Sequence, residues 1–150
     1  MTIRPCTPVD LPAVLQLFYD AVHTACAPHY TPAQLSAWAP EEPDTVRWAD
    51  KLRQEMFLKA EEDGILLGFG ALEEDYLDLL YVRPDWQGRG VGTVLCDFLE
   101  RGCTGESLTV HASRAARLFF QHRGYRLVRA QQVSLRGQTL ENFVMKKELI

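Results

Sequence analysis

Three glycines alternate with other residues in the stretch from Gln87 to Gly92, which reads QGRGVG. A tight turn needs one or two glycines, so three in alternation indicate that a large group approaches a bare backbone. The residues that follow have a helical pattern, and the first N–H groups of a helix lack partners within it and lie at the positive end of its dipole. The stretch therefore predicts a phosphate-binding loop made mostly of backbone, with Arg89 adding charge at its rim.

The spacing of the glycines excludes two common phosphate loops. A Walker A loop ends in Gly-Lys-Ser/Thr, whereas Gly92 is followed by Thr93 and Val94 without a lysine. A dinucleotide fingerprint needs G-x-G-x-x-G inside a strand–helix–strand unit. The spacing here is G-x-G-x-G, and the elements that follow do not form such a unit.

The elements that position the loop follow from the hydrophobic pattern. Tyr76 to Val82 is a strand-like run before the loop, and the residues from Val91 to Arg101 carry one apolar stripe at helical spacing. Further helices are predicted at 8–25, from Thr31 to Pro40, from Asp44 through Leu52, and at 114–122, and further strands at 2–4, 56–60, 65–72, 107–111, 125–135 and 139–147. This order predicts a mixed α/β (α+β) fold with antiparallel hairpins.

Composition limits the class of protein. The 150 residues are 47% hydrophobic and 24% charged, which is typical of one globular domain over residues 1–150. The net charge of −4 gives no basic excess, so no nucleic-acid partner is expected. No apolar run could cross a bilayer and no signal-peptide pattern begins the chain, so we expect a cytoplasmic protein without a membrane partner. The four cysteines form no C-x-x-C pair and no metal-ligand cluster, so no metal is expected.

The loop resembles the acetyl-CoA signature of the GCN5-related N-acetyltransferase (GNAT) superfamily, Q/R-x-x-G-x-G/A, which Gln87 to Gly92 match at every specified position. The residues from Leu80 to Pro84 resemble the end of the family's fourth strand. The family pattern N-x-x-A-x-x-F-Y-x-x-x-G-F keeps its frame from Ser113 to Tyr125 with three substitutions. Residues 30–40 and 135–145 are similar to the YafP-type branch of the superfamily.

The resemblance implies a central, mostly antiparallel twisted sheet of about six to seven strands, with splayed fourth and fifth strands and flanking helices. It implies transfer of acetyl from acetyl-CoA to a primary amine of a small molecule or peptide, by a monomer or homodimer. The cofactor's pantetheine arm is expected between the splayed strands and its pyrophosphate at the glycine loop. The cofactor residues it implies are Leu80, Tyr81, Val82, Gln87, Gly88, Arg89, Gly90, Val91, Gly92, Thr93, Ser113 and Phe119.

Acetyl transfer needs a neutral amine, a polarised carbonyl and a proton donor for the departing thiolate. The resemblance assigns the carbonyl to a backbone N–H, here that of Val82, and the donor to the tyrosine of an F-Y pair. Phe120 occupies that tyrosine's position, so the usual acid is missing. This substitution favours an alternative, a non-catalytic or weakly active acyl-CoA-binding module.

Three residues are candidates for the chemistry. His111 is the first choice for a base because histidine titrates nearest neutral pH, Asp78 is the second, and water is the alternative to both. Ser113 either contacts the cofactor or caps the helix after it. The acceptor pocket is expected between the first helices and the splayed strands, with His29, Tyr30, Trp38 and Tyr76 as its candidate residues.

Overall fold

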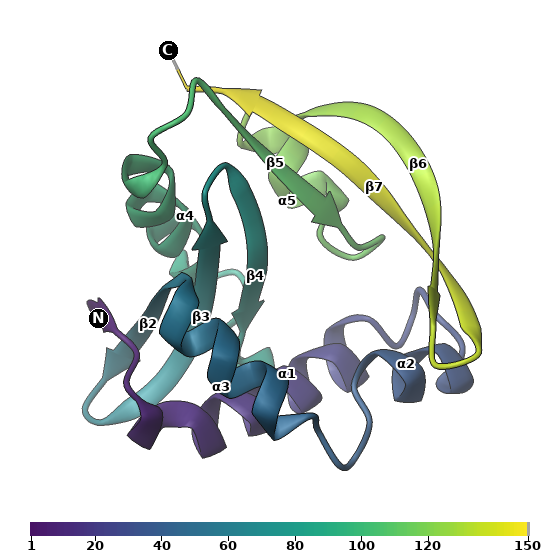
Figure 1. The fold of residues 1–150 in the computed structure, drawn as a ribbon, viewed down its shortest axis with the longest axis horizontal. Helices are drawn as coiled ribbons and strands as arrows, with labels where there is room; N and C mark the ends of the chain where they lie inside the picture. Colours follow the sequence, from purple (N-terminus) through teal and green to yellow (C-terminus); the bar gives the residue numbers. More distant parts are fainter. Residues whose placement is uncertain (150) are drawn as a thin grey trace.

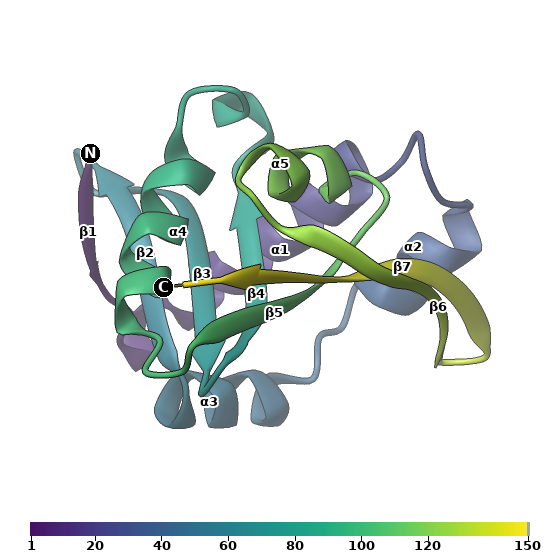
Figure 2. The same cartoon turned by 90° about the horizontal axis from the view of Figure 1, so that it is seen from above.

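The computed structural model describes residues 1–149, whose strands form one sheet in the order β1-β2-β3-β4-β5-β7-β6 (Figures 1 and 2). The strands are β1 (Thr2–Pro5), β2 (Met56–Glu62), β3 (Ile65–Glu73), β4 (Tyr76–Val82), β5 (Ser107–Ala112), β6 (Arg126–Leu135) and β7 (Gln138–Glu148). Neighbouring strands are antiparallel except β4 and β5, which are parallel. The predicted mixed α/β fold with a mostly antiparallel sheet is confirmed.

Five α-helices pack against this sheet in the described part of the chain: α1 (Leu11–Ala25), α2 (Pro32–Trp38), α3 (Thr45–Gln54), α4 (Val91–Gly102) and α5 (Arg117–His122). Side chains cap two of them, since Thr31 Oγ1 accepts from Gln34 N at 3.2 Å and Asp44 Oδ1 from Arg47 N at 3.1 Å. None of the helices within residues 1–149 has the length and apolar character needed to cross a membrane.

Helix α5 begins three residues later than the predicted helix at 114–122. The backbone N–H of Arg114 donates to Tyr30 Oη at 3.0 Å, and its guanidinium donates to the His29 carbonyl at 2.6 Å. These contacts hold Arg114 in a turn that precedes the helix. The start of α5 is therefore set by a tertiary contact, which the local sequence pattern does not contain.

Two apolar layers lie on opposite faces of the sheet. The successive β2 residues Phe57 and Leu58 point to different layers, as side chains of a strand do. Helices α1, α2 and α3 cover the layer that contains Phe57, and α4 and α5 cover the other (Figure 2). Helix α4 buries Val91, Leu95 and Leu99, and each such side chain contributes about 1.5–3 kcal/mol when fully removed from water.

Strands β4 and β5 separate soon after they pair. Only Tyr76↔Thr109 and Leu77↔Val110 are partners, whereas β4 follows β3 as far as the pair Gly68↔Val82. Strand β5 instead stays with β7 through Ala112↔Phe143. Beyond Leu77, the edge of β4 that faces β5 is therefore left without a strand partner. This separation is the predicted splay of the fourth and fifth strands.

Helix α4 approaches β3 closely because glycines stand beneath it. A Cβ added at Gly70 would lie 2.6 Å from Leu99 Cδ1, and one added at Gly68 would lie 2.9 Å from Val91 Cγ1. A larger residue at Gly68 would also meet the Tyr81 carbonyl oxygen at 2.9 Å, and one at Gly70 would displace the Leu99 side chain. The two glycines therefore allow the side chains of Val91 and Leu99 on α4 to pack closely on β3.

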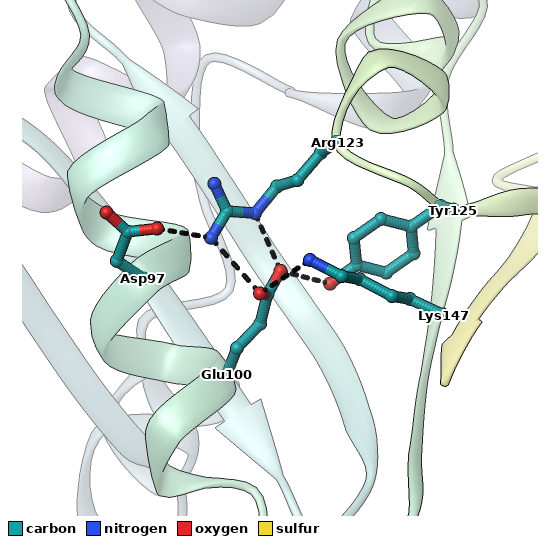
Figure 3. A network of polar contacts seen from close by, with 5 residues as sticks. All are labelled: Asp97, Glu100, Arg123, Tyr125 and Lys147. Carbon is teal, nitrogen blue, oxygen red and sulfur yellow. Dashed lines mark hydrogen bonds and ion pairs between the residues drawn. The ribbon is translucent and has the colours of Figure 1, made fainter. Parts of the chain in front are cut away.

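A polar network holds α4 against the second half of the sheet (Figure 3). Glu100 on α4 accepts hydrogen bonds from Arg123 Nε at 2.6 Å, Tyr125 Oη at 2.9 Å and Lys147 Nζ at 3.0 Å. Arg123 also pairs with Asp97 at 2.6 Å. Arg123 follows α5, Tyr125 precedes β6, and Lys147 lies on β7. The network therefore joins the two parts of the sheet on either side of the splay, β1 to β4 and β5 to β7.

We expect Glu100→Gln to lower the free energy of unfolding by about 2 kcal/mol at neutral pH, because buried donors lose a charged partner. Burial opposes ionisation of Glu100, but the hydrogen bonds from Arg123, Lys147 and Tyr125 lower its pKa below the ordinary 4.5. A carboxylate with a lowered pKa stabilises the fold above its unfolded pKa and loses this contribution as pH falls. In urea unfolding, the difference in free energy of unfolding between wild type and Glu100→Gln should therefore narrow below pH 4.5. A difference that does not change with pH would contradict the stabilising role of the Glu100 carboxylate.

Candidate active site

A cleft of about 400 Å³ occupies the opening between β4 and β5. Helix α1, the N-terminus of α4 and helix α5 complete its walls. All the predicted cofactor residues except Arg89 line it: Leu80, Tyr81, Val82, Gln87, Gly88, Gly90, Val91, Gly92, Thr93, Ser113 and Phe119. Arg89 lies outside the cleft wall, with its guanidinium 4.6 Å from the centre of the Trp86 ring.

The glycine loop presents bare backbone to this cleft. Gly88 and Gly90 have φ values of +74° and +83°, which residues with a side chain rarely adopt. A Cβ added at either position would meet no atom within 4 Å, so the space above the loop is open. Gly90 is the N-cap of α4, whose first N–H groups have no partners within the helix. An anionic group of a ligand fits this end of the cleft.

The free edge of β4 supplies backbone hydrogen-bonding groups along the cleft. Arg83 N donates to Leu67 O at 2.8 Å, and hydrogen-bonded and non-hydrogen-bonded pairs alternate along an antiparallel ladder. The adjacent pair Gly68↔Val82 is therefore a non-hydrogen-bonded pair, in which the N–H and C=O groups of Val82 point away from β3. The polar backbone groups of Val82 therefore face the splay. Its carbonyl accepts from Gln87 Nε2 at 3.2 Å, which ties the start of the glycine loop to the end of the strand. An extended ligand can bind along this edge as an added strand.

A second cleft of about 350 Å³ meets the first between the helices and the splayed strands. Five residues line both clefts: Trp38, Asp78, Tyr81, His111 and Ser113. The structure therefore brings the three predicted catalytic residues to the junction of the two clefts. Of the predicted acceptor residues, Tyr30, Trp38 and Tyr76 line the second cleft, whereas His29 is exposed and lines neither.

The predicted bases lie beside an aromatic ring at this junction. The rings of Tyr76 and His111 meet edge to face, with centres 5.0 Å apart. Burial and the nearby Arg129 lower the pKa of His111, and the charge of Asp78 opposes them in part. Burial raises the pKa of Tyr76 to about 12, and Asp78 adds to this rise. Near neutral pH, His111 is therefore mainly neutral and Tyr76 keeps its proton.

The position of the family's tyrosine offers no proton. Phe120 is 2% exposed, and its ring packs edge to face on Tyr125 at 5.1 Å. Tyr125 donates to Glu100 and lines neither cleft, so it does not replace the missing hydroxyl. Ser113 Oγ accepts from Ala116 N at 3.1 Å and so closes the turn before α5, whose N-cap is Ala116; the predicted helix-capping role of Ser113 is wrong, whereas Ser113 does line the cleft.

Other proton-bearing side chains line the junction or the first cleft. Tyr81 lines both clefts, and burial, followed by the charge of Cys26, raises its pKa. Cys26 lines the first cleft, and burial raises the pKa of its thiol to about 11. Both groups therefore keep their protons at neutral pH. Neither side chain is predicted as a proton donor from the sequence, because the contact of Cys26 with Ser113 and the place of Tyr81 in both clefts depend on how α1 packs over β4.

Two further charged residues are not predicted from the sequence, Lys51 in the last turn of α3 and Glu55 directly after that helix. Lys51 Nζ lies 2.5 Å from Asp78 Oδ2 and 3.6 Å from Glu55 Oε2. The i,i+4 spacing of Lys51 and Glu55 on a helix was a visible signal for their pairing. Their contact with Asp78 was not visible, since it depends on where α3 lies against β4. Within residues 1–149, no cluster of three or more His, Cys, Asp or Glu side chains could hold a metal ion.

Known proteins share this sequence and fold. The family model of the acetyltransferase (GNAT) domain matches residues 26–149. The uncharacterized N-acetyltransferase YafP of Escherichia coli K12 is 35% identical over 144 residues, which cover 96% of this chain and 93% of that protein. A GCN5-related N-acetyltransferase from Rhodopseudomonas palustris is 36% identical, and its crystal structure superposes with a TM-score of 0.95 over 98% of this chain and 94% of that one.

A more distant structure shares the fold alone. The PaiA N-acetyltransferase of Thermoplasma acidophilum, solved in complex with coenzyme A, has 17% identity and a TM-score of 0.78 over 98% of both chains. The predicted resemblance to the superfamily and to its YafP-type branch is confirmed by the sequence matches. The chain therefore belongs to the GCN5-related N-acetyltransferase (GNAT) family.

Proposed function

We propose that this protein transfers an acetyl group from acetyl-CoA to a primary amine. The observation that carries this proposal is the junction of the two clefts at Asp78, His111 and Ser113. One cleft has a bare helix N-terminus at its end and a free strand edge along its side, and the other is open to an acceptor. Membership of the acetyltransferase family supports the same reaction class.

The first cleft fits coenzyme A in three respects. The open space above Gly88 and Gly90 accepts a pyrophosphate, and the free edge of β4 from Leu80 to Val82 accepts the amide groups of a pantetheine arm. Arg89 at the rim adds a positive charge for the phosphates. Two proteins of this fold are described as complexes, PaiA with coenzyme A and YncA of Salmonella typhimurium with acetyl-CoA. When bound, acetyl-CoA would supply a thioester as the activated acetyl donor.

The residues of the junction prepare the acceptor amine. An amine is protonated at neutral pH and must lose a proton before it becomes nucleophilic. Asp78 attracts a cationic amine through its charge and offers a carboxylate oxygen for its proton, whereas the lowered pKa of His111 makes its imidazole a weaker base than an ordinary histidine. We therefore place Asp78 before His111 in this role. Tyr81 and Cys26 hold protons that can reach the first cleft, and they compensate for Phe120.

A second candidate function is an acyl-CoA-binding module without appreciable turnover. The specific observation that favours it is Phe120, which is buried where the family's tyrosine would donate a proton. The two candidates differ in one measurement, the release of free thiol from acetyl-CoA in a panel of aliphatic, aromatic and peptide amines. Amine-dependent thiol release supports the transferase, and tight binding of coenzyme A without release supports the module. Absence of both would contradict both proposals.

Gly90→Glu is expected to weaken coenzyme A binding by about 100-fold, because a carboxylate would occupy the space meant for phosphate. Calorimetric titration measures the affinity, and circular dichroism checks the fold. The matched control is Gly64→Glu in the turn between β2 and β3, where φ is +78° and an added Cβ also meets nothing within 4 Å. Equal affinities of the two variants would contradict the position assigned to the pyrophosphate.

Asp78→Asn is expected to lower kcat/KM by about 100-fold, in the range typical of general bases, with a smaller loss for His111→Ala. The residual activity of Asp78→Asn should rise at alkaline pH, where more of the free amine is present without help from the protein. Steady-state rates from about pH 6 to 9 with one amine test this order. A larger loss in His111→Ala would restore histidine as the base.

A further inference from the structure

Two carboxyl groups and one lysine meet beside the acceptor cleft. Asp78 and Lys51 line this cleft, whereas Glu55 lines neither cleft and lies behind them with its side chain 4% exposed. Lys51 Nζ is 2.5 Å from Asp78 Oδ2 and 3.6 Å from Glu55 Oε2. The cluster combines the end of α3, the residue before β2, and the point of β4 where the splay begins.

The charges around Glu55 do not balance when every group is ionised. Lys51 faces it from α3, Asp78 and Tyr76 from β4, and Glu73 from the end of β3. One cation therefore faces several carboxylates. The second oxygen of Glu55, Oε1, is buried and has no hydrogen-bond partner among residues 1–149. A buried carboxylate oxygen without a donor destabilises the fold.

A single proton removes this imbalance. Two ionised carboxylates are both acceptors and cannot hydrogen-bond to each other, whereas a carboxylic acid can donate to a carboxylate. A proton held between Glu55 and Asp78 gives Glu55 a hydrogen bond and leaves one negative charge to pair with Lys51. The arrangement of the cluster therefore favours one shared proton.

We propose that Glu55 and Asp78 form a proton-sharing carboxyl pair that takes up one proton from the ammonium group of the acceptor. This inference rests on the proposed acetyl transfer. An N–H bond of the ammonium breaks, its electron pair stays on nitrogen, and a new O–H bond forms on Asp78. Glu55 then shares that proton until the pair releases it to water. Glu55 is a positioning residue, because it acts through Asp78 and does not line the cleft.

The acidity of Glu55 agrees with this role. Burial, then the hydrogen bonding and charge of Asp78, raise its pKa from 4.5 to about 7, while Lys51 opposes the rise. A proton acceptor works best when its pKa lies near the working pH. The ionised pair accepts a proton above this pKa, whereas below it the pair already holds one. His111 also faces Asp78 from β5, but its own pKa is lowered.

The dependence of kcat/KM on pH tests the pair through Glu55→Gln. In wild type, kcat/KM should fall as pH drops through about 7, which forms the acidic limb of the pH profile. Glu55→Gln should move this acidic limb to lower pH by about one unit or more, because Asp78 is then the only carboxylate of the pair beside Lys51. The control is Glu106→Gln, which removes an exposed carboxylate outside both clefts and should leave the limb unchanged. A variant that merely loosened the fold would lose activity at every pH without moving the limb.

Unfolding as a function of pH tests the shared proton without any activity. A carboxyl group whose pKa is raised on folding stabilises the fold fully below its unfolded pKa, and this contribution is lost as pH rises. Glu55 should therefore destabilise wild type progressively between pH 4.5 and about 7, and Glu55→Gln should not show this loss. The Tm of the variant relative to wild type should rise by about 5 °C across this interval.

The two measurements separate the possible failures. If wild type acetylates no amine, the proposed function and the role of the pair in it are both contradicted, and the unfolding data decide whether a proton is shared. If wild type is active but the limb of Glu55→Gln stays in place, or the Tm difference is constant with pH, the carboxyl pair is overturned.

Discussion

The early separation of β4 and β5 is the constraint on which the site depends. The two strands pair only at Tyr76↔Thr109 and Leu77↔Val110, and the next residue of β4 is Asp78. Beyond that point the backbone of β4 faces open space instead of a strand, and this space is the first cleft. The same separation exposes Asp78 to the second cleft. A sheet with continuous pairing would have neither a place for an extended ligand nor a junction with an acceptor.

Because β4 and β5 pair so briefly, other contacts must hold the two parts of the sheet, β1 to β4 and β5 to β7, in place relative to each other. Gly68 and Gly70 let the side chains of α4 pack closely on β3, and the N-terminus of the same helix lines the opening. Glu100 then binds Arg123 and Lys147 of the second part through charged hydrogen bonds (Figure 3). Charge-assisted hydrogen bonds of this kind are about twice as strong as neutral ones. The cleft therefore stays open between two parts that α4 joins.

The parts of the structure that depend on local chemistry could be predicted from the sequence. The strand before the glycines, the helix after them and the bare loop follow from periodicity and from the conformations that glycine permits. The partners of Asp78 could not be predicted, because Lys51 and Glu55 reach it only through the packing of α3 against β4. The exposure of His29 depends on tertiary packing in the same way.

We propose above all that the opening between β4 and β5 binds coenzyme A along the edge of β4. The most direct measurement is a titration of coenzyme A into 15N-labelled protein, with ATP as a control, followed through backbone amide chemical shifts. We expect the largest chemical-shift changes at Gly88, Gly90 and Val82, and weaker changes with ATP. Changes confined to residues away from both β4 and the glycine loop, or none at saturating coenzyme A, would contradict it.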